Sequence, residues 1–237
     1  MDEKQEVGVI IVAAGRGTRM GTKESKQYLM LESKPIIVHT LEKFHQHPLI
    51  SQIVLVTGKT DIPRCESWIK QYGLQDSIEV VEGGNERQHS VYRGLHAIRT
   101  PWVLVHDGVR PFVADEHITS CFVTAKEHGA AVLAVPVKDT IKQVNEQNEV
   151  IGTPKRESLW AIQTPQAFRT GDLLRAHEQA SLEGFVGTDD AMLIERLGMK
   201  VKVVEGDYSN VKITTPEDLI YAEFITSRNN KGELTND

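Results

Sequence analysis

The chain has 237 residues, of which 40% are hydrophobic and 25% are charged, and its formal net charge is -6. These values are typical of one sizeable α/β domain, and the acidic balance argues against DNA or long RNA as a partner. No apolar stretch approaches the ~20 residues that a membrane helix needs, and the charged N-terminus does not resemble a signal peptide. Cys65 and Cys121 suggest no disulfide framework, so we expect a cytoplasmic protein.

Short apolar runs rich in β-branched residues recur along the chain and predict strands that are buried on both faces. They lie at residues 7–12, 53–57, 78–81, 103–106, 131–135 and 201–204. Amphipathic segments between them predict helices at residues 35–44, 63–72, 88–99, 115–128 and about 188–198, with a last helix opening at Thr215-Pro216. This alternation predicts a doubly wound, mostly parallel sheet in a single domain over residues 1–237.

Residues 137–163 break this rhythm. Two extended segments flank a polar turn at residues 145–148, and neither has helical periodicity. We therefore predict a protruding β-hairpin arm at about residues 137–160. Because an isolated hairpin is only marginally stable in water, we expect the arm to pack on a second subunit.

A glycine-rich loop follows the first strand and carries the strongest local signal. Gly15 and Gly17 permit close approach of backbone N–H groups to phosphate oxygens. A dinucleotide fingerprint would need glycine at Met20, and a P-loop would need a terminal Gly-Lys-Ser/Thr, so the loop fits neither class. Arg19 and Lys26 are well placed to hold a triphosphate and stabilise a reacting phosphorus. A tight turn with solvated cations is the alternative, and the two cations favour the functional interpretation.

Asp107 ends the apolar run 103–106 and is followed by glycine and by Arg110. A carboxylate at a strand's carboxyl end, near a phosphate loop, suits Mg²⁺, which binds one or two carboxylates plus substrate phosphates. A turn-capping aspartate is the alternative. His106 is more simply explained by packing than by metal binding.

Two further segments carry weaker signals. Gly83 and Gly84 follow a short strand and precede Ser90 on a helix, which would let the backbone approach a flat base, although an ordinary capped loop explains them equally well. Lys212 lies in a strand-like segment, where a lysine is unusual unless it faces solvent or an anion.

Taken together, these motifs carry a family resemblance. Residues 13–20 resemble the nucleotide loop of the sugar-phosphate nucleotidyltransferase superfamily. More narrowly, residues 83–91, 106–111, 136–140, 164–166 and 210–214 resemble the 2-C-methyl-D-erythritol 4-phosphate cytidylyltransferase family of the non-mevalonate isoprenoid pathway. The likeness covers about residues 7–225.

The resemblance implies transfer of CMP from CTP to 2-C-methyl-D-erythritol 4-phosphate, with Mg²⁺. It implies that Arg19 and Lys26 stabilise the transition state, and that Arg156 and Lys212 position the attacking phosphate. The implied CTP-binding residues are Ala13, Ala14, Gly15, Gly17, Gly83, Gly84 and Ser90. The implied acceptor-binding residues are Asp107, Arg110, Thr140, Arg156, Thr164 and Thr188, with Asp107 also at the metal. In the family, Thr140 and Arg156 lie on an arm that reaches the neighbouring subunit's site, so a homodimer is implied.

The sequence departs from the family pattern at two places and leaves two other functions open. Gly108-Val109 replaces a frequent pair of alanines, and Ser209 stands where many members have an acidic residue. Ribitol 5-phosphate cytidylyltransferase shares the glycine-rich loop, the segment at residues 106–111 and the Lys212 motif. Its members tend to have Leu-Ala-Gly-Gly where this chain has Val-Ala-Ala-Gly at residues 12–15, and residues 87–90 and 187–190 also favour the erythritol enzyme. A non-catalytic nucleotide-binding module would be expected to have lost Arg19, Lys26 or Lys212. We also expect residues 22–25 to close over the triphosphate.

Overall fold

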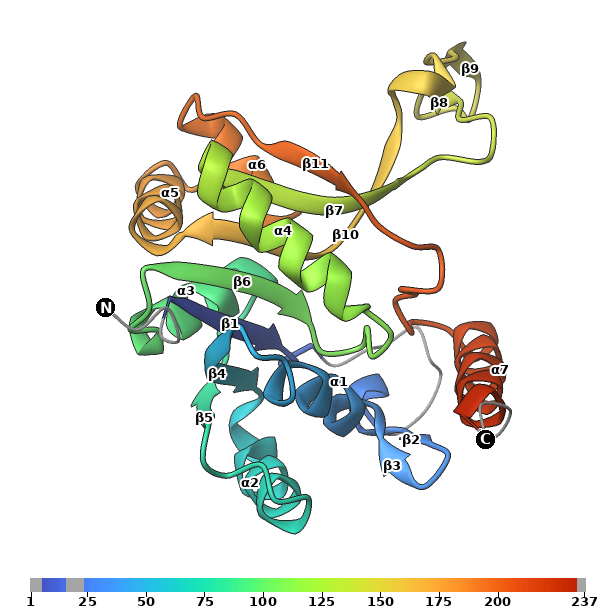
Figure 1. Cartoon of the computed structure of the whole chain (residues 1–237). Helices are drawn as coiled ribbons and strands as arrows, with labels where there is room; N and C mark the ends of the chain where they lie inside the picture. Colours follow the sequence, from blue (N-terminus) through green and yellow to red (C-terminus); the bar gives the residue numbers. More distant parts are fainter. Residues whose placement is uncertain (1–5, 16–23, 234–237) are drawn as a thin grey trace.

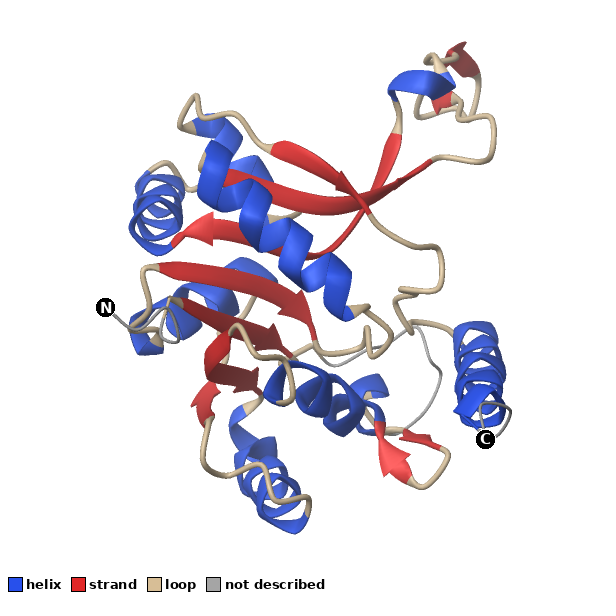
Figure 2. Ribbon diagram, viewed as in Figure 1, coloured by secondary structure: helices blue, strands red, loops and turns tan. Residues whose placement is uncertain are grey.

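The computed structural model describes residues 6–15 and 24–233. In this part of the chain, a seven-stranded sheet has the order β11-β7-β10-β6-β1-β4-β5, with helices on both faces (Figures 1 and 2). Its strands are β1 (Val7–Val12), β4 (Ile50–Thr57), β5 (Ile78–Glu82), β6 (Trp102–Asp107), β7 (Ala130–Pro136), β10 (Trp160–Arg169) and β11 (Lys202–Glu205). The six strands predicted from apolar runs are confirmed, and β10 is the additional one.

The sheet is parallel except at β10. Strand β1 runs parallel to β4 and β6, β4 runs parallel to β5, and β11 runs parallel to β7. Strand β10 is antiparallel to both of its neighbours, β6 and β7. The mostly parallel, doubly wound sheet is therefore confirmed, and the carboxyl ends of β1, β4, β5 and β6 share one edge.

Helices cover the two faces of the sheet in two sets. One set is α1 (Ile36–His45), α2 (Ile62–Gln71) and α4 (Asp115–His128), and the other is α3 (Arg87–Ala97), α5 (Thr170–Leu182) and α6 (Asp190–Arg196). In β1, Val9 and Ile11 pack with the first set while Ile10 packs with the second, and all three are fully buried. Because successive strand side chains point to opposite faces, a continuous apolar run is what a two-sided core requires.

The predicted helix 115–128 coincides with α4, and the other predicted helices also form. Helix α5 was not predicted. The strand-like interpretation of the Lys212 segment is wrong, because residues 211–214 form no strand. A polar side-chain network, described below, holds this segment instead of a strand ladder.

The predicted arm is present as a two-stranded sheet of β8 (Gln143–Val144) and β9 (Val150–Gly152), which projects from the body (Figure 1). Asn145 makes its polar turn, since its Oδ1 accepts hydrogen bonds from the backbone N–H groups of Gln147 and Glu149 at 3.1 and 2.9 Å. The strands are shorter than predicted, and a 3₁₀ turn, η5 (Arg156–Ser158), follows them. Val150 and Ile151 are 59% and 67% exposed, so the arm's apolar surface is not covered by its own chain.

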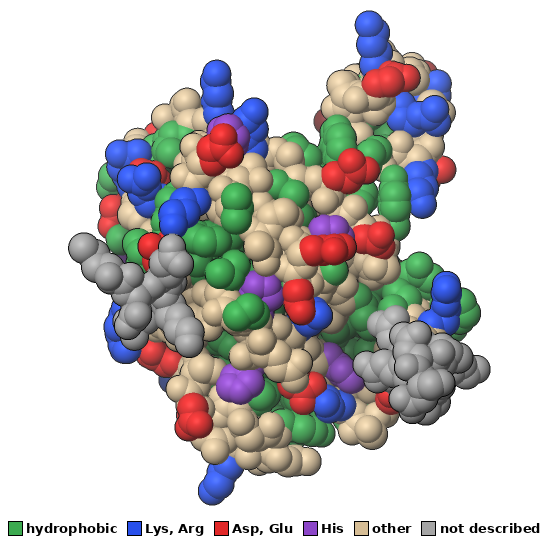
Figure 3. All heavy atoms as spheres, viewed as in Figure 1, with side chains coloured by type: hydrophobic (Ala, Val, Ile, Leu, Met, Phe, Trp, Pro, Cys, Tyr) green, Lys and Arg blue, Asp and Glu red, His purple; other side chains and the backbone are tan. Residues whose placement is uncertain are grey.

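The remaining elements are short, apart from the last helix. They are η3 (Lys26–Tyr28), β2 (Met30–Leu31), β3 (Lys34–Pro35), η4 (Lys59–Asp61) and α7 (Pro216–Glu233). Helix α7 packs through Leu219 and Ala222 on a small cluster that includes Leu31, Val109 and Ile213. None of the helices described has both the length and the apolar character needed to cross a bilayer. Basic and acidic side chains are interspersed over the face shown in Figure 3.

Candidate functional site

Two cavities lie at the carboxyl edge of the sheet. The first, called the loop cavity, has a volume of about 270 Å³ and is lined by residues 12–15, 26–27, 84–87, 90, 107, 109 and 212. The second, called the threonine cavity, has a volume of about 280 Å³ and is lined by Arg87, Asp107, Arg110, Ile162, Gln163, Thr164, Gln166, Thr188, Asp189 and Lys212. Three residues, Arg87, Asp107 and Lys212, line both cavities and form a shared wall.

Gln27 holds the backbone of the loop cavity. Its buried Nε2 donates hydrogen bonds to the carbonyl oxygens of Ala13 at 2.7 Å and Gly15 at 3.0 Å. The neighbouring Lys26 begins η3 and lines the same cavity. Of the predicted phosphate-loop residues, Gly17 and Arg19 lie outside the described residues, as does part of the 22–25 loop.

The two glycines after β5 allow the chain to lie against the first loop. A Cβ on Gly83 would sit 2.4 Å from the Cβ of Ala14, and one on Gly84 would sit 2.4 Å from the Cβ of His89. The Oγ of Ser90 accepts a hydrogen bond from the backbone N–H of Gly84 at 3.1 Å. The structure thus brings together Ala13, Ala14, Gly15, Gly84 and Ser90 in the loop cavity, and Gly83 lines an adjoining cavity of about 830 Å³ that shares Ala14, Gly15 and Gly84 with it.

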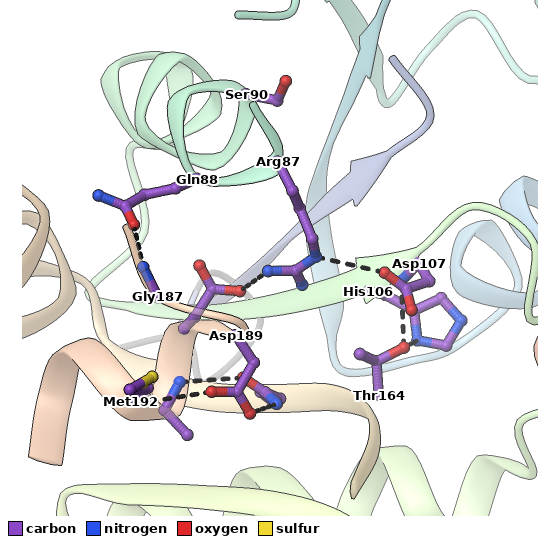
Figure 4. Close-up of polar contacts among 12 residues, drawn as sticks. Arg87, Gln88, Ser90, His106, Asp107, Thr164, Gly187, Asp189 and Met192 are labelled. Carbon is purple, nitrogen blue, oxygen red and sulfur yellow. Dashed lines mark hydrogen bonds and ion pairs between the residues drawn. The ribbon is translucent and has the colours of Figure 1, made fainter. Parts of the chain in front are cut away.

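Asp107 is surrounded by cations at the shared wall. Its Oδ2 lies 2.8 Å from Lys212 Nζ and 3.5 Å from Arg110 Nε, while its Oδ1 lies 3.5 Å from Arg87 Nε (Figure 4 shows the Arg87 contact). Burial alone would raise the pKa of Asp107, but Arg87, Lys212 and Arg110 together hold it well below its usual value. The carboxylate is therefore ionised and the wall carries net positive charge, which suits a phosphate.

A chain of hydrogen bonds behind Asp107 joins β6 to β10. The Asp107 backbone N–H donates to Thr164 Oγ1 at 3.1 Å, and that hydroxyl lies 3.1 Å from His106 Nδ1. His106 Nε2 lies 2.9 Å from the Arg110 carbonyl oxygen, which can only accept, so Nε2 carries the proton and Nδ1 accepts from Thr164. Burial lowers the pKa of His106 to about 4, so the ring is neutral. The expected packing role of His106 thus includes orienting Thr164.

Asn210 explains how an irregular segment places Lys212 on Asp107. Its Nδ2 donates to the Thr164 carbonyl oxygen at 2.9 Å and to Gln163 Oε1 at 3.2 Å. Its own carbonyl oxygen accepts from Arg110 Nη1 at 2.7 Å. Residues 210–212 are therefore fixed to β10 and to the loop after β6 without a strand ladder.

The structure separates the predicted acceptor residues into two groups. Arg110, Thr164 and Thr188 line the threonine cavity with Asp107, and their binding of an acceptor stays a prediction. Thr140 and Arg156 lie exposed on the arm, and Arg156 Nη1 donates to the Lys138 carbonyl oxygen at 3.1 Å. They do not line the described cavities of their own chain, so their role at a partner's site stays a prediction.

Sequence reasoning did not assign a role to Arg87 or Gln27. Arg87 was visible only as part of a motif, since nothing in a linear pattern shows that it lines two cavities. Gln27 is a polar residue whose burial follows from the fold. The helix-start pattern at residues 188–190 did identify a real cap, because Asp189 Oδ1 accepts from the Met192 backbone N–H at 3.0 Å.

The side chains around Asp107 limit how a metal ion can be bound at this site. Within the described residues, no three His, Cys, Asp or Glu side chains lie close enough together to hold a metal ion. The Asp107 carboxylate is already engaged by cations on both oxygens. Among the described side chains, a cation at this site would therefore meet at most one carboxylate, which suits an Mg²⁺ held mainly by substrate phosphates.

A doubly wound sheet with a glycine-containing loop and a cation-lined wall at its carboxyl edge defines a nucleotide-binding α/β protein. The model of the 2-C-methyl-D-erythritol 4-phosphate cytidylyltransferase family matches residues 7–228. The enzyme of that name from Alkaliphilus metalliredigens is 52% identical over 231 residues, covering 96% of each chain, and that from Bacillus velezensis is 51% identical over 222 residues, covering 93% of this chain and 95% of the relative. The chain belongs to the 2-C-methyl-D-erythritol 4-phosphate cytidylyltransferase family.

Solved structures agree with this assignment. The crystal structure of 4-diphosphocytidyl-2C-methyl-D-erythritol synthase from Anaerococcus prevotii is 33% identical, with a TM-score of 0.84 over 95% of this chain and 97% of that one. The cytidylyltransferase from Thermus thermophilus is also 33% identical, with a TM-score of 0.76 over 93% of this chain and 98% of that one.

Proposed function

We propose that this chain transfers CMP from CTP to 2-C-methyl-D-erythritol 4-phosphate, releasing pyrophosphate and giving 4-diphosphocytidyl-2-C-methyl-D-erythritol for isoprenoid synthesis. Family membership supports the reaction. The observation that carries the proposal is the shared wall, because two cavities that meet at Arg87, Asp107 and Lys212 allow donor and acceptor to face each other.

In this proposal, CTP occupies the loop cavity. The backbone at residues 13–15 and 83–84 and the Ser90 hydroxyl enclose the nucleotide, and Lys26 lies beside its phosphates. Lys26, together with Arg19, neutralises charge that develops at the α-phosphorus. We also infer that the 22–25 loop closes over the triphosphate.

The acceptor occupies the threonine cavity. Lys212 at the shared wall and Arg110 in the threonine cavity hold its phosphate, while Thr164 and Thr188 contact its hydroxyl groups. A phosphate oxygen of the acceptor attacks the α-phosphorus of CTP, and the bond to the β-phosphate oxygen breaks. Because a phosphate monoester is already anionic, no strong general base is needed, and catalysis consists of positioning and charge neutralisation.

Mg²⁺ is part of the proposal as an ion bound mainly by the triphosphate, with Asp107 as the nearby carboxylate. It would supply neutralisation of phosphate charge when bound.

One apolar side chain favours the methyl-branched acceptor over ribitol 5-phosphate. Ile162 lines the threonine cavity among residues that are otherwise polar or charged, and it is 42% exposed. It offers a surface on which the 2-C-methyl group removes apolar area from water.

We further propose a homodimer in which the arm carries Thr140 and Arg156 to the partner's threonine cavity. The exposed apolar side chains of the arm support this, since burial against a second subunit would cover them. We also propose a cytoplasmic location, which two unpaired, buried cysteines suit.

Pyrophosphate release from CTP and Mg²⁺ tests the function, with 2-C-methyl-D-erythritol 4-phosphate and ribitol 5-phosphate assayed in parallel. Turnover mainly with the first acceptor is expected. Turnover mainly with ribitol 5-phosphate would transfer the same chemistry to wall-polymer synthesis, and CTP binding without turnover would indicate a non-catalytic module.

A further inference from the structure

A buried chain of charged side chains leads away from the shared wall. Arg87 Nη1 lies 2.6 Å from Asp190 Oδ2, and His177 Nε2 lies 3.2 Å from Asp190 Oδ1. The side chains of Asp190 and His177 are each 1% exposed, and neither residue lines the loop cavity or the threonine cavity. A buried carboxylate is costly unless it is paired, so its presence behind Arg87 requires an explanation.

Asp190 is held rigidly. It is the first residue of α6, whose N-terminus is fixed to β10, since Gln166 donates to Asp189 Oδ2 at 2.9 Å and accepts from the Ala191 backbone N–H at 3.2 Å. His177, from α5, must donate through Nε2 because a carboxylate only accepts. Burial alone would raise the pKa of Asp190, but Arg87 and His177 lower it further than burial raises it, so the group is ionised.

Gln88, the neighbour of Arg87, ties the start of α3 to the same region. Its Nε2 donates to the Phe185 carbonyl oxygen at 3.0 Å, and its Oε1 accepts from the Gly187 backbone N–H at 2.8 Å (Figure 4 shows the Gly187 contact). The backbone of α3 is thus anchored by Gln88 and the guanidinium of Arg87 is anchored by Asp190. The Nε of the same guanidinium faces Asp107 and lies 3.5 Å from its Oδ1.

We propose that Asp190, oriented by His177, is a positioning residue that fixes the Arg87 guanidinium against Asp107 at the wall shared by the two cavities. The inference rests on the proposed function of that wall. Without Asp190, Arg87 keeps only its 3.5 Å contact with Asp107 among these pairs, and its long side chain gains rotational freedom. A misplacement of about 1 Å in a reacting geometry costs roughly 10²-fold in rate.

The first experiment uses Asp190→Asn, which keeps the size of the side chain and removes its charge. We expect kcat, expressed per CTP-binding site, to fall by about 10²-fold, while the Kd for CTP without acceptor changes by less than about threefold. Expressing kcat per binding site removes the effect of molecules that have not folded. A kcat within about twofold of the wild-type value would overturn the proposal.

A matched pair at His177 avoids removing the buried charge. His177→Gln keeps an N–H donor near the position of Nε2, whereas His177→Leu removes it. We expect the glutamine variant to stay within about threefold of the wild-type kcat and the leucine variant to lose roughly tenfold. Equal losses in the two variants would show that the ring only fills space.

A double-mutant cycle tests whether Asp190 acts through Arg87. The kcat of the Arg87→Met/Asp190→Asn double variant should lie within about threefold of that of Arg87→Met alone, because without the guanidinium Asp190 has nothing to position. Losses that multiply would contradict the proposal.

A structural readout separates this inference from the proposed function. The Arg87 Nε–H signal in ¹⁵N-resolved NMR, assigned with Arg87→Lys, should show slow guanidinium rotation in the wild type and fast rotation in Asp190→Asn. Unchanged rotation would overturn the positioning role even in an active enzyme. Absence of turnover in the wild type, with restricted Arg87 rotation, would count against the function alone.

Discussion

At the scale of single residues, Lys212 makes the shortest ion pair to Asp107, with 2.8 Å between Nζ and Oδ2. Replacing it with methionine should lower kcat by about 10²-fold, because a cation that contacts the transferred charge is lost, while CTP affinity changes little. Steady-state pyrophosphate release and CTP titration provide the measurements. Lys202→Met, on an exposed position of β11, is the matched control and should retain wild-type activity. Equal activity of both variants would exclude Lys212 from the reaction.

Ile162 provides the second residue-scale prediction. Ile162→Ser should reduce the preference for 2-C-methyl-D-erythritol 4-phosphate over D-erythritol 4-phosphate in kcat/KM by roughly tenfold, since one methyl group in an apolar contact accounts for discrimination of that order. The absolute kcat/KM for the unbranched acceptor should stay nearly constant. Val203→Ala, an exposed apolar position on β11, should leave the ratio unchanged. An unaltered preference in Ile162→Ser would place the methyl group elsewhere.

At the scale of elements, the contact between β6 and β10 depends on a neutral His106. Its pKa of about 4 in the folded state lies below the value near 6.5 of an exposed histidine, so between these pH values the unfolded chain binds more protons. This contribution to stability is fully present above pH 6.5 and is lost as the pH falls to 4, with a total of about 3 kcal/mol. Urea unfolding of wild type and His106→Gln at pH 7, 5.5 and 4.5 measures it, and the variant should show the shallower pH dependence. Identical pH dependence would contradict the buried, neutral ring.

The close contact between Gly83 and the loop after β1 gives another prediction. Gly83→Ala places a Cβ 2.4 Å from the Ala14 Cβ, so the loop must shift, and we expect CTP affinity to fall by tenfold or more and stability by about 1–3 kcal/mol. Gly171→Ala, where an added Cβ meets nothing within 4 Å, is the control and should be neutral or slightly stabilising. Calorimetry and CTP titration separate the two effects. Equal CTP affinity in both variants would show that the loop tolerates the added atom.

The helices and strands also show which parts of the fold can be predicted from the sequence alone. Strands such as β1 were predictable because a two-sided core demands a continuous apolar run, and α4 was predictable from its amphipathic period. Strand β10 contains polar Gln163, Thr164 and Gln166 in its buried part, so its apolar signal is interrupted. Lys212 was misassigned to a strand because its segment is held by long-range contacts, namely the Lys212–Asp107 ion pair and the hydrogen bonds of Asn210 to Thr164 and Arg110. The pairing of Arg87 with Asp190 is likewise long-range and leaves no local periodicity.

At the scale of the whole molecule, the proposed exchange of arms can be tested by complementation. Arg156→Ala impairs the arm and leaves the pocket intact, whereas Lys212→Met impairs the pocket and leaves the arm intact. If the arm acts on the partner, a mixed dimer has one working site, so an equimolar mixture after subunit exchange should regain roughly a quarter of wild-type activity. Activity no greater than the mean of the two variants would show that each arm serves its own chain or none.

Two cavities that meet at one wall are proposed to bring donor and acceptor together, and a crystal structure of the chain with 4-diphosphocytidyl-2-C-methyl-D-erythritol tests this arrangement most directly. We predict the cytidine in the loop cavity against Gly84 and Ser90, the methylerythritol in the threonine cavity beside Thr164 and Thr188, and the diphosphate between them at Lys212 and Arg87. A product whose sugar-alcohol end lies outside the threonine cavity, or whose diphosphate does not reach Lys212, would contradict the account.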